Sequence, residues 1–192
     1  MAKLVTENVG RFNQHYPASA VVVTAQANGK RNAMAVAWHC SISFKPPLYG
    51  ISIAAKRYTY QLIAASKEFA INFMPLEAAE LIASLGGSAG KDTDKFQRFN
   101  ITTDRSLKTG APILSAAYAA YECKLVDDKG YGDHRWLVGE VAAVHTRDKA
   151  FTAEEVLDLS QVSPALFMGR ELYATTDKSK ISKFDREVYG KR

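Results

Sequence analysis

VVVTAQANGKRNAMAVAWHCSISFKPPLYGISIAAKRYT, residues 21–59, is the stretch that decides the fold. Asn28-Gly29 separates two apolar runs rich in β-branched residues, and this dipeptide in such a place is the strongest short-range signal for a β-hairpin. The two predicted strands are residues 18–25 and 31–38. The first hairpin therefore follows from turn chemistry and hydrophobic pattern alone.

A third predicted strand, residues 48–53, runs into Lys56, Arg57 and Thr59, where a helix is expected to begin. Free backbone N–H groups and the helix dipole favour an anion at such a point, and the two cations and the hydroxyl add charge-assisted hydrogen bonds. The spacing predicts a site for a phosphate-bearing ligand. An ordinary helix cap beside two solvated bases accounts for it equally well.

The rest of the chain is also rich in strands, which are joined mostly by turns. Six strands of this length indicate a mainly β fold, an antiparallel barrel or sandwich with a few short helices. The further predicted strands are residues 69–73, 120–126 and 135–144, the last two forming a second hairpin through the loop DDKGYGDH. The predicted helices are residues 59–66, capped by Thr59, and 76–85, stopped by Gly86-Gly87.

The character of the chain changes after residue 147. Residues 1–147 are predicted to form one domain, and residues 148–192 a C-terminal extension that packs over the barrel or over a partner subunit. FTAEEVLDL, residues 151–159, is predicted to form a short helix, with Thr152 and Glu155 as a capping box.

The overall composition is that of an ordinary globular protein. The 192 residues carry a net charge of +5, but the basic residues are spread along the chain and the strands carry mainly Val, Ala and Ile. A nucleic-acid-binding barrel would need aromatic residues interleaved with Lys and Arg on an exposed strand face, so no nucleic-acid partner is predicted. Two cysteines without a CxxC pair, no secretion signal and no membrane-length apolar stretch predict a cytoplasmic protein with no membrane segment.

GGSAGKDTDKF, residues 86–96, is a glycine-rich turn that carries Lys91 and Lys95. It is not a P-loop, because Asp92 follows the lysine where a Ser or Thr is needed. The turn could close over a ligand as a flexible cationic lip. A solvated loop at the end of a helix is the competing interpretation.

Three further side chains are candidates for a site. Asn32, on the second strand of the hairpin, has an amide that can both donate and accept, and Trp38 offers a stacking surface, although an isolated Trp is usually core. His134 lies at a loop–strand junction, where it could handle protons or bind an anion, although a lone histidine is more often structural. Cys40 and Cys123 lack the spacing of a zinc site, and no metal is predicted.

Seven segments, in order, resemble the flavin reductase-like family with the FMN-binding split barrel, and its flavoredoxin-like branch in particular. They span roughly residues 17–144. The segments are RNAMAVAW (31–38), KPPL (45–48), ISIAAKRYTYQLI (51–63), EFAINF (68–73), SAGKDTDKF (88–96), AYECKL (120–125) and GDHRWLVGEV (132–141).

The resemblance implies a homodimer of six-stranded Greek-key split barrels, with FMN, or FAD in its place, bound near the subunit interface. NAD(P)H would be the electron donor, and His134 would act catalytically on the nicotinamide side. Phe167 belongs to a tail segment that would approach the flavin. The flavin ring would lie along Asn32, Ala33, Met34, Ala35 and Trp38, and its ribityl phosphate would be held by Ser52, Ala54, Lys56, Thr59 and Tyr60 with Ser88, Lys91 and Lys95.

Two functions share these flavin contacts. One is an NAD(P)H-dependent flavin or flavoprotein reductase, in which the protein supplies binding and orientation and the flavin carries the electrons. The other is a non-enzymatic FMN electron carrier reduced by a redox partner protein. The sequence leaves open the physiological acceptor, NADH against NADPH, FMN against FAD, and a tightly bound flavin against a flavin substrate.

Overall fold

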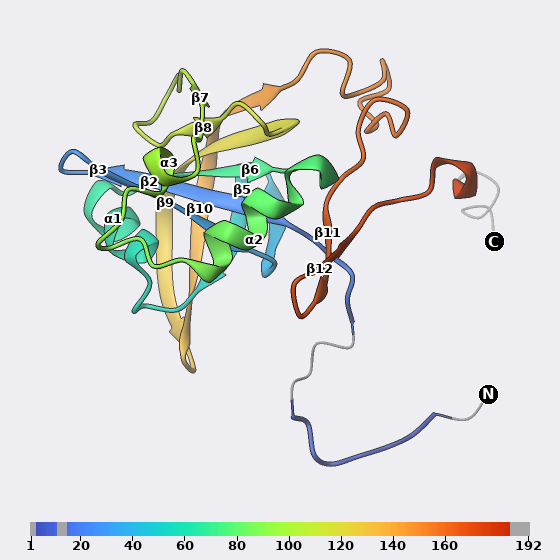
Figure 1. The fold of residues 1–192 in the computed structure, drawn as a ribbon, viewed down its shortest axis with the longest axis horizontal. Helices are drawn as coiled ribbons and strands as arrows, with labels where there is room; N and C mark the ends of the chain where they lie inside the picture. Colours follow the sequence, from blue (N-terminus) through green and yellow to red (C-terminus); the bar gives the residue numbers. More distant parts are fainter. Residues whose placement is uncertain (1–2, 11–14, 185–192) are drawn as a thin grey trace.

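A seven-stranded antiparallel sheet, curled into a barrel, forms the centre of the molecule in this computed structural model, which describes residues 3–10 and 15–184 (Figure 1). The strand order is β3-β2-β6-β9-β10-β5-β4. The strands are β2 (Val21–Ala27), β3 (Lys30–Val36), β4 (His39–Phe44), β5 (Pro47–Ile53), β6 (Glu68–Phe73), β9 (Ala119–Tyr131) and β10 (His134–Thr146). The predicted mainly β fold is therefore confirmed.

Short helices and two small sheets complete the fold. The helices are α1 (Tyr58–Ser66), α2 (Ala79–Gly87), α3 (Lys95–Arg98) and the 3-10 turns η1 (Leu76–Ala78) and η2 (Lys178–Lys180). The small sheets are β1-β11-β12 (Ala18–Ser19, Leu166–Gly169, Leu172–Ala174) and β7-β8 (Thr103–Asp104, Ile113–Leu114). Within residues 3–10 and 15–184, no helix has the length and apolarity needed to cross a membrane.

The first hairpin forms as its turn residues predict. Asn28 and Gly29 both have positive φ, 52° and 73°, which a two-residue type I′ turn requires. The register pairs Ala27 with Lys30 at the turn and Val21 with Val36 at the far end. The predicted hairpin is thus confirmed. Its strands differ slightly in extent, because β2 covers residues 21–27 where 18–25 were predicted, and β3 covers residues 30–36 where 31–38 were predicted.

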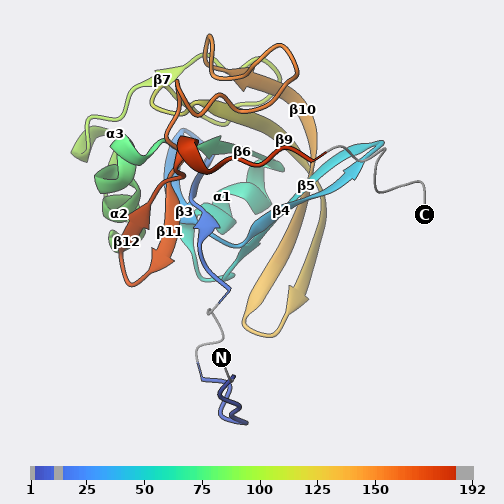
Figure 2. The same ribbon diagram turned by 90° about the vertical axis from the view of Figure 1, so that its right-hand side faces the viewer.

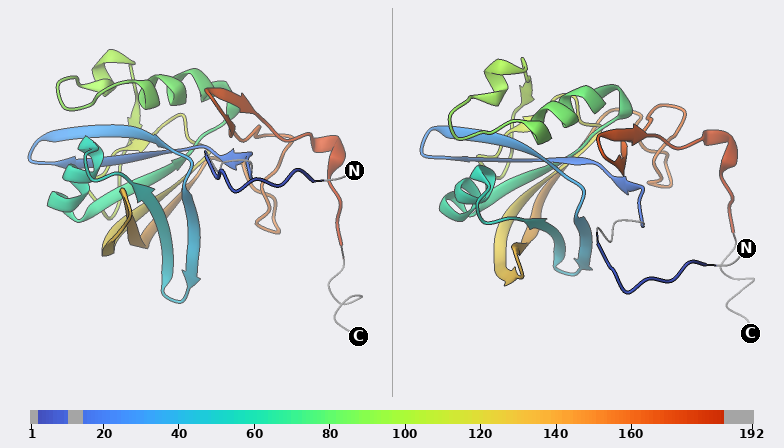
Figure 3. Two further views of the ribbon diagram at one scale, coloured as in Figure 1. Left: turned by 90° about the horizontal axis from the view of Figure 1, so that it is seen from below. Right: turned by 60° about the horizontal axis from the view of Figure 1, so that its bottom comes forward.

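Strand β2 is buried on both faces because it lies between two layers. Val21 and Val23 belong to the cluster inside the barrel, whereas Val22 packs in a second cluster with Ile82 and Leu85 of α2. Figure 3 shows α2 lying over this outer face of the hairpin. Each such side chain contributes about 1.5–3 kcal/mol through burial. Helix α2 therefore fixes the outer face of the β2–β3 hairpin, while α1 closes one end of the barrel.

The sheet has one more strand than predicted. β4 is an edge strand in which no residue is fully buried, so its sequence, HCSISF, lacks a strong apolar pattern. The second hairpin is also longer than predicted, because the expected loop between β9 and β10 continues the ladder as far as the pair Tyr131–His134. Figure 2 shows this hairpin reaching away from the barrel.

One glycine is required by the narrow barrel interior. A Cβ atom at Gly139 would lie 2.5 Å from the Cζ atom of Phe69 and 2.7 Å from the Cβ atom of Cys123. Both distances are far below van der Waals contact. The β9–β10 register also shifts between Val138 and Gly139, which bends the strands at this point.

Glu122 anchors the loop that precedes β8. Its fully buried carboxylate accepts hydrogen bonds from the backbone N–H groups of Leu107, Lys108 and Thr109 at 2.6–2.8 Å, and from Nε2 of His145 at 2.7 Å. Burial alone would raise the pKa of this carboxyl group. The hydrogen bonds outweigh burial and lower the pKa to about 2.

The helix predicted over residues 151–159 is wrong. Phe151 and Leu157 form an isolated bridge, and the N–H of Thr152 bonds to the carbonyl of Val156. Glu155 takes a left-handed conformation, φ 59°, which interrupts any helix. Packing of Phe151 and Leu157 on the cluster around Tyr118 and Ala119 therefore overrides the local capping pattern.

The C-terminal segment packs against the barrel of its own chain. Ala165 bonds to Met74 and Ala20 through its backbone, and β11 pairs with β1 so that Phe167 lies opposite Ala18. These bonds bring β11 and β12 beside α2 (Figure 3). The division of the chain at residue 147 stays a prediction.

Candidate functional site

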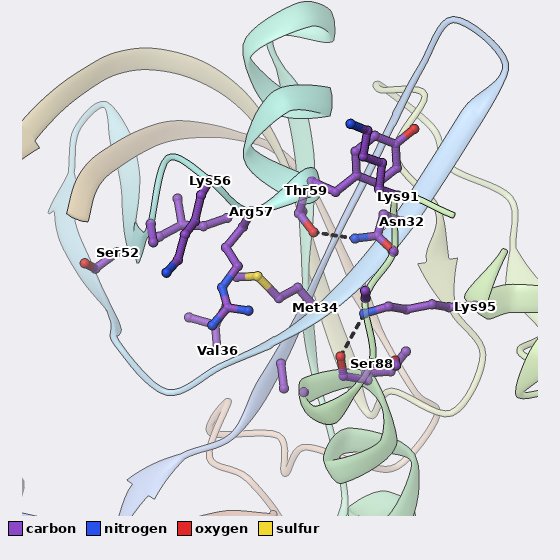
Figure 4. A pocket seen from close by; sticks show the side chains of 18 of the residues that line it. Asn32, Met34, Val36, Ser52, Lys56, Arg57, Thr59, Ser88, Lys91 and Lys95 are labelled. Atoms are coloured by element: carbon purple, nitrogen blue, oxygen red, sulfur yellow. Dashed lines mark hydrogen bonds between the residues drawn. The ribbon is translucent and has the colours of Figure 1, made fainter. Parts of the chain in front are cut away.

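A cleft of about 350 Å³ lies between β3, the end of β5, the start of α1 and the loop after α2 (Figure 4). It brings together most of the predicted site residues from separate parts of the chain. They are Asn32, Met34, Ala35, Trp38, Ser52, Ala54, Lys56, Thr59, Ser88, Lys91, Lys95 and His134.

Three predicted site residues lie outside the cleft. Ala33 packs in the cluster beneath α2 and is not among the residues that line the cleft. Tyr60 lies further along α1 and donates its hydroxyl to Asp128 Oδ2 at 3.0 Å. Phe167 packs against the ring of Tyr173, in a neighbouring hollow.

The start of α1 is open to an anion. Arg57 occupies the N-cap position, no side chain caps the helix, and no acidic residue lies in its first turn. The helix dipole and the N–H groups of the first turn therefore favour negative charge here. Figure 4 shows Lys56 and Arg57 extending over the cleft from this point. The predicted capping of α1 by Thr59 is wrong, because the helix already begins at Tyr58.

Thr59 instead joins the helix to the hairpin. Its Oγ1 accepts a hydrogen bond from Nδ2 of Asn32 at 2.8 Å, and both side chains are buried. The Oδ1 atom of Asn32 is also buried, but it has no hydrogen-bond partner. A buried carbonyl oxygen without a donor is unfavourable by about 1–3 kcal/mol. This acceptor is therefore available to a ligand that carries a donor group.

Gly90 lets the loop after α2 approach β3 closely. A Cβ atom at this position would collide with the amide group of Asn32. Lys91 follows it and lines the same cleft. Lys91 of the predicted cationic lip therefore lies at the cleft, whereas Lys95 belongs to α3 and is not part of a flexible loop. The close approach of the loop depends on Gly90, which the sequence could not single out from Gly86 and Gly87.

Lys95 is the most buried cation of the cleft. Its side chain is 2% exposed, and Nζ donates to the carbonyl oxygens of Ala33 at 3.0 Å and Leu85 at 2.8 Å. Burial, with a smaller effect from the positive charge of Arg57, lowers the pKa of Lys95 to about 8. An ammonium has three donors, so a third N–H remains for an anion in the cleft.

The other end of the cleft is aromatic. The rings of Trp38 and His134 have centroids 5.0 Å apart, and Nε1 of Trp38 donates to the hydroxyl of Tyr16 at 3.2 Å. Nδ1 of His134 lies 2.7 Å from Oδ1 of Asp133, and this hydrogen bond lowers the pKa of the Asp133 carboxyl group. His134 is therefore held beside the cleft mouth.

Within residues 3–10 and 15–184, no group of three or more His, Cys, Asp or Glu side chains is arranged so that it could hold a metal ion. Both ring nitrogens of His39 are engaged, one with the hydroxyl of Tyr49 at 2.7 Å and the other with the carbonyl oxygen of Ser19 at 2.9 Å.

Tyr58 also lines the cleft and was missed, because nothing in its local sequence distinguishes it from other half-buried aromatic residues. Arg57 was found from its position before the helix.

Residues 13–176 match the flavin reductase like domain. The chain belongs to the flavin reductase-like family. A relative from Aeropyrum pernix, itself uncharacterized, is 34% identical over 156 residues, which are 81% of this chain and 59% of that protein. FMN reductase (NADH) RutF 1 of Methylorubrum extorquens is 31% identical over 134 residues, 69% of this chain and 65% of that one. The chain thus spans about three fifths of the length of these two curated relatives.

Solved structures confirm the split-barrel fold. The FMN-binding protein from Thermus thermophilus, solved with bound p-hydroxybenzaldehyde, is 29% identical with a TM-score of 0.84, covering 95% of this chain and 100% of that one. A flavin reductase with a split-barrel domain from Shewanella frigidimarina has a TM-score of 0.83 at 22% identity, covering 95% of this chain and 93% of that one. Flavoredoxin from Methanosarcina acetivorans has a TM-score of 0.79 at 23% identity, covering 100% and 98%.

Proposed function

We propose that this protein binds FMN in the cleft and uses it to oxidise NAD(P)H, as a flavin or flavoprotein reductase. The observation that carries the proposal is the uncapped, cation-flanked start of α1 at one end of a cleft that runs along β3. This arrangement suits a ligand with a phosphate at one end and a flat ring at the other. The family of this chain and the FMN reductase and FMN-binding relatives support the same ligand.

The residues of the cleft fit FMN. The phosphate would lie at the start of α1, within reach of Arg57, Lys91 and Lys95, and the ring would lie along β3 toward Trp38. The unpartnered Oδ1 of Asn32 would accept from a ribityl hydroxyl or a ring N–H, which removes the cost of its burial. FAD shares these groups, so it is the alternative flavin.

The flavin would supply the two-electron chemistry, and the protein would supply binding, orientation and exclusion of water. A wider hollow of about 590 Å³ adjoins the cleft and shares Trp38, Ser52 and His134 with it. We infer that this hollow receives the nicotinamide of NAD(P)H. His134 donates from Nδ1 to Asp133, so Nε2 of its neutral ring would hold the nicotinamide by accepting a hydrogen bond from the carboxamide NH2 group.

The alternative is an FMN carrier that a redox partner protein reduces, and one experiment separates the two. The purified protein is loaded with FMN and titrated anaerobically with NADH and NADPH while the flavin absorbance is followed. A reductase loses this absorbance, and His134→Ala slows the loss at least tenfold while FMN binding is kept. Lys124→Ala, an exposed position on the same hairpin but outside both hollows, serves as the control and is expected to behave as wild type.

Flavin that stays oxidised with both nicotinamides would refute the reductase and support the carrier. Identifying the flavin released on denaturation of the protein as purified settles FMN against FAD. The Thermus relative with a bound phenolic aldehyde also makes small ring compounds candidate acceptors for this chain.

We also infer a homodimer. β4 is the edge of the main sheet, and two of its apolar side chains are unusually open to solvent, Ile42 at 44% and Phe44 at 95%. Burial against a second copy would cover both, since exposed apolar edges of this kind mark interaction surfaces. Light scattering should give twice the chain mass for wild type, and a monomer for wild type would contradict the inference. Cytoplasmic location stays a prediction.

A further inference from the structure

A second hollow, of about 180 Å³, lies where β3 and α2 meet the C-terminal hairpin β11–β12. We call it the hairpin pocket; its own walls are Ala20, Ile82, Phe167, Glu171 and Tyr173. It borders the proposed flavin cleft directly, because the two share the segment 35–37 and Gly86. Figure 3 shows the hairpin lying beside α2. Its residues Phe167, Glu171 and Tyr173 form one wall of the pocket.

The walls of the hairpin pocket are apolar apart from two groups. Among the described residues that line it, only Glu171 and Tyr173 carry polar side-chain atoms. Apolar walls with a few placed polar groups are typical of small-molecule sites. A carboxylate is an acceptor and a phenol is both donor and acceptor, so the pair matches a ligand hydroxyl or carbonyl.

The size of the pocket suits a ligand with a single ring. An apolar protein cavity of about 150 Å³ takes up benzene. The hairpin pocket, at about 180 Å³, leaves room for one six-membered ring with one or two small substituents. A charged ligand is disfavoured, because an anion would meet Glu171 and any ion would lose its hydration against the apolar walls.

The walls also favour a flat ring. The ring of Phe167 lies 5.5 Å from that of Tyr173 and 5.4 Å from that of Tyr16, in tilted and edge-on arrangements. Tyr16 in turn accepts the hydrogen bond from Trp38 at the mouth of the flavin cleft. Phe167 and Tyr173 therefore give the hairpin pocket two aromatic rings, and aromatic rings prefer aromatic partners.

The tip of the hairpin is a two-residue turn formed by Arg170 and Glu171, which lies between the paired residues Gly169 and Leu172. Both turn residues have positive φ, 52° and 58°, as a type I′ hairpin turn requires. Here the turn places the carboxylate of Glu171 at the edge of the pocket.

We propose that the hairpin pocket binds a neutral, single-ring phenol next to the flavin site, with Phe167 packing on the ring and Glu171 accepting from its hydroxyl group. The pocket thereby selects which small ring compound reaches the flavin. This role rests on the proposed function, but the binding itself does not, because the residues that form the pocket are present without flavin.

The test measures phenol binding by NMR, following the methyl groups of Ala20 and Ile82 in the apoprotein and in the FMN-loaded protein. Phenol should shift these signals in both forms. Cyclohexanol, which is not flat, and benzoate, which is charged, should bind at least tenfold more weakly. Failure of flavin reduction would leave this result unchanged, so the two proposals can fail separately.

Variants locate the site. Phe167→Ala should weaken phenol binding by about tenfold, the size of a good aromatic contact. Glu171→Gln, on an exposed turn where the fold is not at risk, should weaken it by a smaller factor, because an amide oxygen is a poorer acceptor than a carboxylate. Met168→Ala, on the same strand but 46% exposed and outside the pocket, is the control and should leave binding unchanged.

Three outcomes would overturn the proposal. The first is that phenol shifts neither methyl signal. The second is that Met168→Ala weakens binding as much as Phe167→Ala does. The third is that FMN displaces phenol, which would place the ring in the flavin cleft.

Discussion

Replacing Lys95 with Met should remove a pH dependence from FMN binding. Lys95 lies buried in the cleft, and its pKa is lowered from 10.5 to about 8, first by burial and then by the charge of Arg57. A phosphate in the cleft favours the ammonium form and therefore raises this pKa again. Above pH 8, FMN binding must then take up a proton, and its affinity must fall as the pH rises.

The expected magnitude follows from the pKa. With a value near 8, Lys95 is about nine-tenths charged at pH 7 and about one-tenth charged at pH 9 in the flavin-free protein. The dissociation constant of FMN should therefore rise about tenfold between these two pH values. The phosphate itself contributes little, because its second pKa lies at about 6 and it is doubly charged over this range.

The assay is a fluorescence titration with FMN and, as a ligand without phosphate, riboflavin. Wild type should show the tenfold change for FMN only, and Lys95→Met should show it for neither ligand. Lys91→Met, an exposed lysine of the same lip, should weaken FMN binding at both pH values and keep the slope. An unchanged slope in Lys95→Met, or an equal slope with riboflavin, would refute the assignment of the phosphate to this lysine.

The pH dependence of the free energy of unfolding provides an independent check, since stability should rise with pH where FMN affinity falls. Because the pKa of Lys95 is lower in the folded state than its ordinary value, the charged form costs folding free energy at pH below about 8. That cost disappears as the pH rises from about 8 to 10.5. Flavin-free wild type should therefore gain unfolding free energy relative to Lys95→Met over this window in urea titrations.

Two further changes test how the fold supports the cleft. Glu122→Ala should cost about 3–5 kcal/mol in urea unfolding, because it leaves several buried donors unpaired, whereas exposed Glu140→Ala should cost little. The pKa of Glu122 is lowered from 4.5 to about 2, so its contribution to the free energy of unfolding should be complete above pH 4.5 and vanish toward pH 2. An acid titration in which wild type and Glu122→Ala lose stability in parallel would contradict this. Gly139→Ala should lower the free energy of unfolding by about 1–3 kcal/mol through overpacking, as measured by thermal unfolding. Gly87→Ala is the control and should not destabilise the protein, because a Cβ atom there meets nothing within 4 Å. Equal melting temperatures for the two variants would show that the barrel interior has room for a methyl group.

The parts of the fold that the sequence predicted are those set by local chemistry. The first hairpin depends on Asn28-Gly29, whose turn conformation needs no distant contact. The start of α1 directly after β5 and its two cations likewise follows from residues in immediate succession, although the sequence predicted a cap at Thr59 that the structure does not show. β4 was not predicted, because an edge strand can pair with its neighbour without an apolar alternation in its sequence. The helix predicted over residues 151–159 does not form, because packing against Tyr118 outweighs the local capping pattern.

The resemblance supplied most residues of the cleft, but not how they meet. The hydrogen bond between Asn32 and Thr59 joins residues 27 positions apart, and Lys95 reaches a carbonyl group 62 positions away. Such contacts exist only once the hairpin, α1 and α2 are packed together. Phe167 shows the same limit, since only the pairing of β11 with β1 places it in its own pocket beside the cleft.

The amino-acid sequence by itself determined the β architecture, the turn of the first hairpin and the family, because these depend on periodicity and on residue types close together in the chain. Only the tertiary structure decided which lysine is buried, which asparagine oxygen lacks a donor and that a second pocket adjoins the first. The physical reason is that burial and the separation of charges are properties of packed surfaces, which no local stretch of chain contains.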